Sequence, residues 1–177
     1  MVESASRSLR DGFLPGEFAP ALMLLNRFSC PHSARALLLH LMASLSSSVA
    51  AGTAQAKCIV LVAAERGPEY YQSFHGFKEE QLLRFHFVDC FVDPLGWRKL
   101  LSQQKLLEEA KEKLPFYKVC HDLRDLDALL SFILQLGTSG NSETVHFSIV
   151  IDSISSLLAY NSADSVIKFL NNLRSNG

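Results

Sequence analysis

The sequence lacks the glycine-rich loop with which many nucleotide-binding proteins hold phosphate. The pattern G-x-x-x-x-G-K-S/T occurs nowhere among its 177 residues. Such a loop needs glycines, so that backbone N–H groups can approach the phosphates, and a lysine to meet their charge. The patterns G-x-G-x-x-G, H-E-x-x-H and G-x-S-x-G are also missing. Their absence excludes the best-known motifs of dinucleotide-binding enzymes, zinc proteases and serine hydrolases.

Cysteine is scarce, and charge is nearly balanced. The four cysteines are Cys30, Cys58, Cys90 and Cys120, and no two of them have C-x-x-C or zinc-finger spacing. Free thiols in apolar runs are commonly buried, which favours a reducing compartment. The net charge of −1 gives no general attraction to nucleic acid or to an anionic membrane. Binding of RNA would therefore need a local basic patch or basic partners.

Long uncharged apolar segments are absent as well. Residues 1–20 are polar and mix acidic with basic side chains, so we expect a flexible N-terminal segment with no secretory signal. Residues 36–56 carry no charge, but they contain too many serines and other small polar residues to span a bilayer. We expect a soluble intracellular protein with no membrane partner.

Apolar runs and helical patterns do alternate along the chain. The hydrophobic fraction is 48% and the charged fraction 20%, which is typical of a globular domain. Strands are predicted at residues 21–25, 58–62, 82–90, 116–120 and 145–151, and helices at 33–47, 97–114, 122–137 and 162–174. Asp122 is the predicted cap of the third helix. This alternation predicts an α/β domain over residues 21–177, with a mainly parallel sheet covered by helices on both faces.

The stretch from Val145 to Ser153 is the main candidate for a functional site. Its apolar, β-branched middle suits a strand buried on both faces of a parallel sheet. An apolar strand that ends in an aspartate is typical of a Walker B segment, in which the carboxylate lies near the Mg²⁺ of a nucleotide. The alternative is that Asp152 or Ser153 caps the next helix. In that case, Asp152→Asn would cost no more than a cap change, about 0.5–2 kcal/mol.

Other polar residues have simpler interpretations. In a Walker protein the phosphate loop would follow the first strand, but residues 26–34 contain no glycine and no lysine. Asp89 and Asp93 lie at the end of a predicted strand, where α/β sites usually form, but they have no evident nucleophile or base as a partner. Asp93 with Pro94 is also a good turn starter. Histidines such as His40, His86 and His146 are interpreted as satisfied core or edge residues.

Two segments give the chain a resemblance to a known family. Residues 89–97, which read D-C-F-V-D-P-L-G-W, and residues 149–153, which read I-V-I-D-S, are similar to segments of the fifth subunit of the Elongator complex. The order of strand, degenerate loop, helix and strand before them is also similar. This resemblance, from about residue 21 onward, implies a three-layer RecA-like fold, related to P-loop NTPases but without a phosphate-binding loop. The second segment occurs in many RecA-like proteins, so the first is the more specific.

The resemblance also implies a function. Members of the family form a hexameric ring with the fourth and sixth subunits of Elongator, and the ring binds transfer RNA during modification of the wobble uridine, U34. It implies a non-catalytic structural subunit with no cofactor, in the cytoplasm and nucleus. Asp152 and Ser153 would hold a degenerate Walker B position, and Arg27, Arg35, Lys57 and Arg66 are candidate RNA-facing residues. The alternative is a divergent nucleotide-dependent ATPase of the RecA-like class.

The chain departs from the family pattern at its C-terminal end. RecA-like domains continue beyond the Walker B strand, and the next strand normally lies between that strand and the first one. We therefore expect a form that is truncated at the C-terminus and incomplete in its sheet. The edges of the strands at residues 21–25 and 145–151 would then lack partners, which would lower stability and solubility.

Overall fold

The centre of the fold is a parallel sheet of four strands in the order β3-β2-β1-β4. The computed structural model describes residues 21–25, 33–74, 77–97, 116–138 and 146–176. Its strands are β1 (Cys58–Ala63), β2 (Phe85–Asp89), β3 (Tyr117–Val119) and β4 (Phe147–Ile151). Its helices are α2 (Ser33–Ala50), α3 (Pro68–Gln72), α4 (Glu79–Leu82), α7 (Leu126–Gly137), α8 (Ile154–Leu158) and α9 (Ala163–Asn176). The predicted α/β class with a parallel sheet is confirmed for the described residues.

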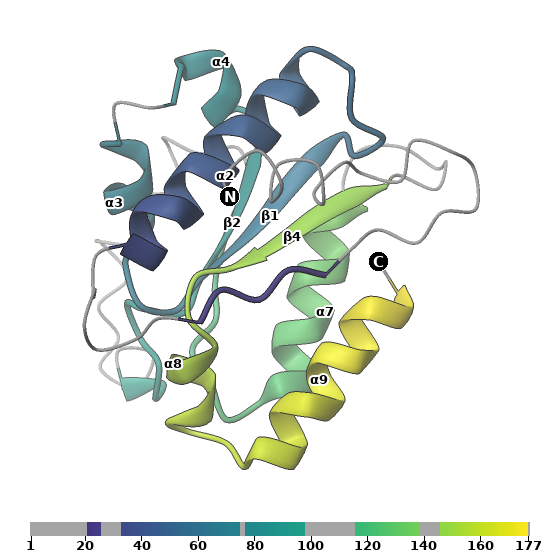
Figure 1. Cartoon of the computed structure of the whole chain (residues 1–177). Helices are drawn as coiled ribbons and strands as arrows, with labels where there is room; N and C mark the ends of the chain where they lie inside the picture. Colours follow the sequence, from purple (N-terminus) through teal and green to yellow (C-terminus); the bar gives the residue numbers. More distant parts are fainter. Residues whose placement is uncertain (1–20, 26–32, 75–76, 98–115, 139–145, 177) are drawn as a thin grey trace.

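Helices cover both faces of the sheet (Figure 1). One face packs against α2, through the side chains of Leu39, Met42 and Val49 and, from β1, Ile59 and Leu61. The other face packs against α7 and α9, through Leu129, Ile133, Val166 and Phe169 and, from β1, Val60 and Val62. Because successive side chains of a strand point to opposite faces, the unbroken apolar run of β1 serves both layers.

The inner and outer strands differ in burial. Every residue of β1 and β2 is buried, whereas every residue of β4 is partly exposed. Among the described residues, β4 pairs only with β1 and therefore forms an edge of the sheet. The predicted burial of this stretch on both faces is met only in part: Ile149 and Ile151 pack against one apolar layer and Val150 against the other, but each side chain stays partly exposed.

The predicted strand at Ala21–Leu25 is not present. These residues have no regular secondary structure, and Leu22, Met23 and Leu25 are 44%, 63% and 81% exposed. An apolar run specifies a preference for burial, but it does not provide a neighbouring strand with which to pair. The predicted strand at residues 21–25 is therefore wrong.

The remaining predictions differ from the structure in detail. The predicted strand at residues 82–90 is shorter, since Leu82 belongs to α4. Asp125, not Asp122, caps α7, and its side chain accepts the N–H of Ala128 at 2.9 Å. His86 is buried as expected, and its Nδ1 lies 2.7 Å from the carbonyl oxygen of Leu136. The expected N-terminal segment of residues 1–20 and most of the predicted helix at 97–114 lie outside the described residues.

Candidate functional site at the carboxyl ends of the strands

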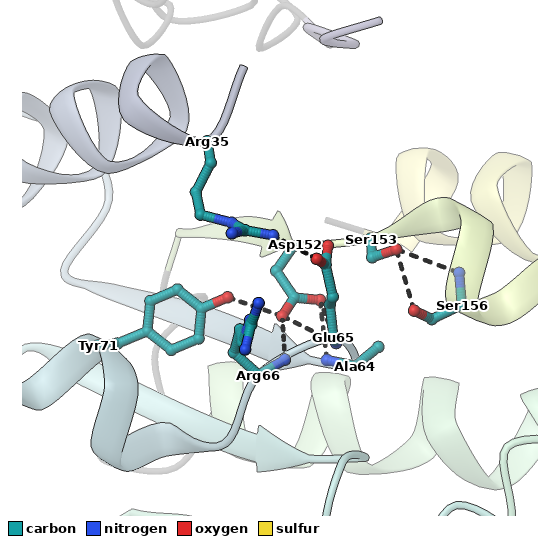
Figure 2. A network of polar contacts seen from close by, with 8 residues as sticks. All are labelled: Arg35, Ala64, Glu65, Arg66, Tyr71, Asp152, Ser153 and Ser156. Atoms are coloured by element: carbon teal, nitrogen blue, oxygen red, sulfur yellow. Dashed lines mark hydrogen bonds and ion pairs between the residues drawn. The ribbon is translucent and has the colours of Figure 1, made fainter. Parts of the chain in front are cut away.

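Asp152 lies directly after β4, and its carboxylate is surrounded by hydrogen-bond donors (Figure 2). One oxygen, Oδ1, accepts the backbone N–H groups of Ala64 at 2.8 Å and Glu65 at 3.2 Å. The other, Oδ2, accepts the N–H groups of Glu65 at 3.0 Å and Arg66 at 3.2 Å, and the hydroxyl of Tyr71 at 2.7 Å. The carboxylate therefore joins the end of β4 to the loop between β1 and α3.

These hydrogen bonds fill the capacity of the Asp152 carboxylate to accept further donors. An ionised carboxylate has about four lone-pair sites, and here four different groups donate to it. A metal ion at Asp152 would have to displace at least one of these donors. The helix cap that the sequence suggested at Asp152 or Ser153 belongs to Ser153, whose hydroxyl accepts the N–H of Ser156 at 3.1 Å.

Burial shifts the pKa values of both side chains in this contact. Desolvation raises the pKa of Asp152, while the hydrogen bonds from Tyr71 and the three backbone amides act in the opposite direction. Desolvation also raises the pKa of Tyr71, and the neighbouring charge of Asp152 raises it further. The Tyr71 hydroxyl therefore stays protonated and acts as a donor to the carboxylate, not as a base.

Asp89, at the end of β2, makes a second contact of the same kind. Its Oδ1 accepts the backbone N–H groups of Phe91 at 2.9 Å and Val92 at 3.0 Å. Its Oδ2 accepts the hydroxyl of Tyr117, from β3, at 2.6 Å. Burial and this hydrogen bond raise the pKa of Tyr117. Asp89 thus forms a structural junction between a loop and the neighbouring strand.

The turn that follows β2 is held in place by a third acidic side chain. Asp93 is buried, and its Oδ2 lies 2.9 Å from Nδ1 of His121. Gly96 ends the turn with a φ of 75°, and a Cβ atom added there would lie 3.0 Å from the carbonyl oxygen of His121. A glycine is required at this position both for its left-handed backbone and for the close approach.

The predicted basic residues do not form one patch. Arg35, on α2, forms an ion pair with Glu65, and Arg66 lies over the ring of Tyr70 at 5.7 Å. Figure 2 shows Arg35 and Arg66 near Asp152, at the carboxyl end of β1. Lys57 is exposed and directly precedes β1, so it lies at the amino-terminal end of that strand, away from Arg35 and Arg66. Arg27 lies outside the described residues.

A hollow of about 270 Å³ lies next to the Asp152 network. It is lined by Ala64, Glu65, Phe91, Pro94, Ser156, Ala159 and Tyr160. These residues include no lysine or arginine, and their one carboxylate, Glu65, is paired with Arg35. The lining therefore offers no cationic side chain to a nucleotide phosphate.

The described residues contain no group of three or more His, Cys, Asp or Glu side chains that could hold a metal ion. No helix among them is long and apolar enough to cross a bilayer. Comparison with known proteins found no matching family, no matching curated protein and no matching solved structure.

Sequence reasoning located Asp89 and Asp152 but did not find their partners. Asp89 ends an apolar strand and Asp152 follows one, and that signal is local. Tyr71 and Tyr117 carry no local signal, since they lie 81 and 28 residues away from the carboxylates to which they donate.

Proposed function

We propose that this chain is a non-catalytic scaffold subunit with a RecA-like fold. The observation that supports this proposal most is the occupied carboxylate of Asp152. The one acidic group at the Walker-B-like position is already used to hold the loop after β1, through three backbone amides and Tyr71. A residue engaged in this way stabilises the fold and is poorly available to a nucleotide-bound metal.

We further propose that the scaffold belongs to the Elongator complex, beside the fourth and sixth subunits. The support is the resemblance of residues 89–97 and 149–153. The described fold also has a parallel sheet whose edge strand, β4, is followed directly by Asp152. In this assembly the subunit supports binding of transfer RNA for wobble-uridine modification. With a net charge of −1 and Arg35 paired to Glu65, RNA affinity would come from several copies and partners acting together.

The outer edge of β4 is the surface through which such a subunit could join another chain. The N–H of Asp152 bonds to the carbonyl of Val62, so residues 148 and 150 also direct their backbone groups toward β1. Backbone groups alternate in direction along a strand, and those of Phe147, Ile149 and Ile151 therefore point outward. No strand pairs with them among the described residues. Unpaired edges of this kind invite pairing with another strand.

Co-purification with the fourth and sixth subunits tests the proposal. The wild-type chain is expected to be recovered with them. Ile149→Pro is expected to lower that recovery, because it removes an outward N–H while leaving the bonds to β1 in place; proline is tolerated at sheet edges. Ile167→Lys, at an exposed position of α9, is the matched control. Failure of the wild-type chain to co-purify, or equal recovery of both variants, would contradict the proposal.

The competing function, a divergent ATPase, makes a different prediction. It requires saturable turnover of Mg²⁺-ATP by the purified chain. The scaffold proposal predicts no such turnover by this chain alone. The tRNA component is tested separately: the isolated chain is expected to bind transfer RNA weakly and in a salt-dependent manner, and tight binding by the monomer would contradict it.

A further inference from the structure

Two buried cysteines lie side by side at the carboxyl ends of β2 and β3. Strands β2 and β3 are parallel, with Val88 opposite Lys118 and Asp89 opposite Val119. The next pair in this register is Cys90 and Cys120. The backbone supports the continuation, since the N–H of Cys120 bonds to the carbonyl of Asp89 at 2.8 Å.

Both thiols lie on the same face of the sheet. Cys90 and Cys120 are 0% and 2% exposed and belong to the apolar layer between the sheet and the helices α7 and α9. Neighbouring strands lie about 4.8 Å apart. Bridged cysteines have Cα atoms about 4.4–6.8 Å apart. A pair in this register is therefore expected to have the Cα spacing that a disulfide requires.

We propose that Cys90 and Cys120 form a dithiol site that a small peroxide oxidises to an intrachain disulfide. Hydrogen peroxide represents the class of oxidant. The bond would fasten β3, a strand of three residues at the other edge of the described sheet, to the buried strand β2. This inference does not depend on the proposed scaffold function.

The two thiols are not equivalent. A hydrogen bond with the thiol of Cys90 lowers the pKa of Cys120, and burial acts in the opposite direction. The same contact and burial raise the pKa of Cys90. We therefore expect Cys120 to react first, because the thiolate is the nucleophile. Burial alone raises the pKa of Cys58 to about 11, and no cysteine lies beside it in the register of its strand, which makes Cys58 an internal control.

The chemistry balances in two steps. The Cys120 thiolate attacks one oxygen of hydrogen peroxide, the O–O bond breaks, and a sulfenic acid and hydroxide form. The sulfur of Cys90 then attacks the sulfenyl sulfur, the S–O bond breaks, and the departing oxygen leaves as water with the proton of Cys90. Overall, two thiols and one peroxide give one disulfide and two waters.

The test uses a chain with Cys30→Ser and Cys58→Ser, so that only the proposed pair remains. Treatment with hydrogen peroxide is expected to lower the intact mass by about 2 Da, for two hydrogens lost. Digestion should give a linked peptide containing Cys90 and Cys120, which dithiothreitol separates. Prior unfolding in urea should lower the yield of that peptide several-fold, because the register no longer holds the sulfurs together.

Two further variants assign the order of reaction. Adding Cys90→Ser should leave a sulfenic acid at Cys120 that a dimedone probe captures, whereas adding Cys120→Ser should leave Cys90 mostly unlabelled. The wild-type chain is mapped in parallel, so the test remains valid if a variant does not fold. The proposal is overturned if the native chain gives no Cys90–Cys120 peptide, if Cys58 is linked in preference, or if the folded and unfolded chains give equal yields.

Discussion

Asp152 and Asp89 make the same kind of contact, but the backbone amides that they bind lie at very different distances along the sequence. Each lies at the end of a strand that pairs with β1, and each accepts backbone amides and one tyrosine hydroxyl. Asp89 binds amides two and three residues ahead, whereas Asp152 binds an amide 88 residues back. Asp89 therefore shapes its own loop, while Asp152 fixes the position of an edge strand relative to the centre of the sheet.

The difference shows how one residue type serves local and global structure. A local contact can form early and cheaply, because little chain entropy is lost when it closes. The Asp152 contact forms only once β1 and β4 are paired, but it then satisfies three loop amides and a buried hydroxyl together. We expect the unfolding free energy to depend more strongly on Asp152 than on Asp89.

Removal of the long-range contact should have the largest effect. Asp152→Ala leaves the amides of residues 64–66 and the Tyr71 hydroxyl without their acceptor, and should lower the unfolding free energy by roughly 2–4 kcal/mol. Asp152→Asn should also exceed the cost of a cap change, because its NH₂ group would face N–H donors. Urea titration measures both, with Asp164→Asn, an exposed carboxylate on α9, as the control. A loss below 0.5 kcal/mol, roughly the lower limit for a cap, would refute the structural role.

Removal of the local contact should have a smaller effect. Asp89→Asn is expected to lower the unfolding free energy by about 1–3 kcal/mol, since it disturbs two loop amides and one hydroxyl. Hydrogen exchange should show faster exchange at Phe91 and Val92 with little change in β4. If the variant instead loosens β4 as much as Asp152→Ala does, the distinction between the two contacts is wrong.

Removal of one hydroxyl group from Tyr71 or Tyr117 tests each contact separately. Tyr71→Phe and Tyr117→Phe each remove one hydrogen bond to a carboxylate and should cost about 1–2 kcal/mol. A double-mutant cycle of Tyr71→Phe with Asp152→Ala should show coupling, because the two side chains share that bond. The matched cycle of Tyr71→Phe with Asp89→Asn should be additive. Coupling in the second cycle would show that the two contacts are not independent.

A fall in pH should have the smallest effect on the unfolding free energy, and we expect His86, on β2, to cause it. Burial lowers the pKa of His86, and only its hydrogen bond to the carbonyl of Leu136 opposes this shift. A group with a depressed pKa in the folded state binds protons better when unfolded, so its stabilisation is present above about pH 6.5 and is lost as the pH falls toward the folded value. His86→Gln should flatten this part of the stability profile. Urea titrations of the wild-type chain and of this variant at several pH values measure the profile.

The buried strands were predictable because their signal is local. Cys58–Ala63 and Phe85–Asp89 are apolar runs that end at polar or breaking residues, and both became central strands. Ala21–Leu25 has an equally apolar pattern but forms no strand, because a strand needs a partner as well as a preference. The half-exposure of β4 was unpredictable for the same reason.

The polar site was predictable only in part. The position of Asp152 after an apolar strand marked it as important, but the pattern is shared by metal ligands, helix caps and structural carboxylates. What distinguishes them is the set of donors, and those lie on a loop far away in sequence. The cap of α7 was misassigned between Asp122 and Asp125 because both precede the same helical pattern, and Asp122 instead pairs with Arg124.

We propose above all that the carboxylate of Asp152 stabilises the fold and does not serve nucleotide chemistry. The most direct test measures Mg²⁺-ATP turnover and the unfolding free energy of the same preparations of wild-type chain and Asp152→Asn. We predict no saturable turnover in either protein and a clear loss of stability in the variant. Saturable turnover in the wild-type chain that Asp152→Asn abolishes, with the unfolding free energy unchanged, would contradict the claim.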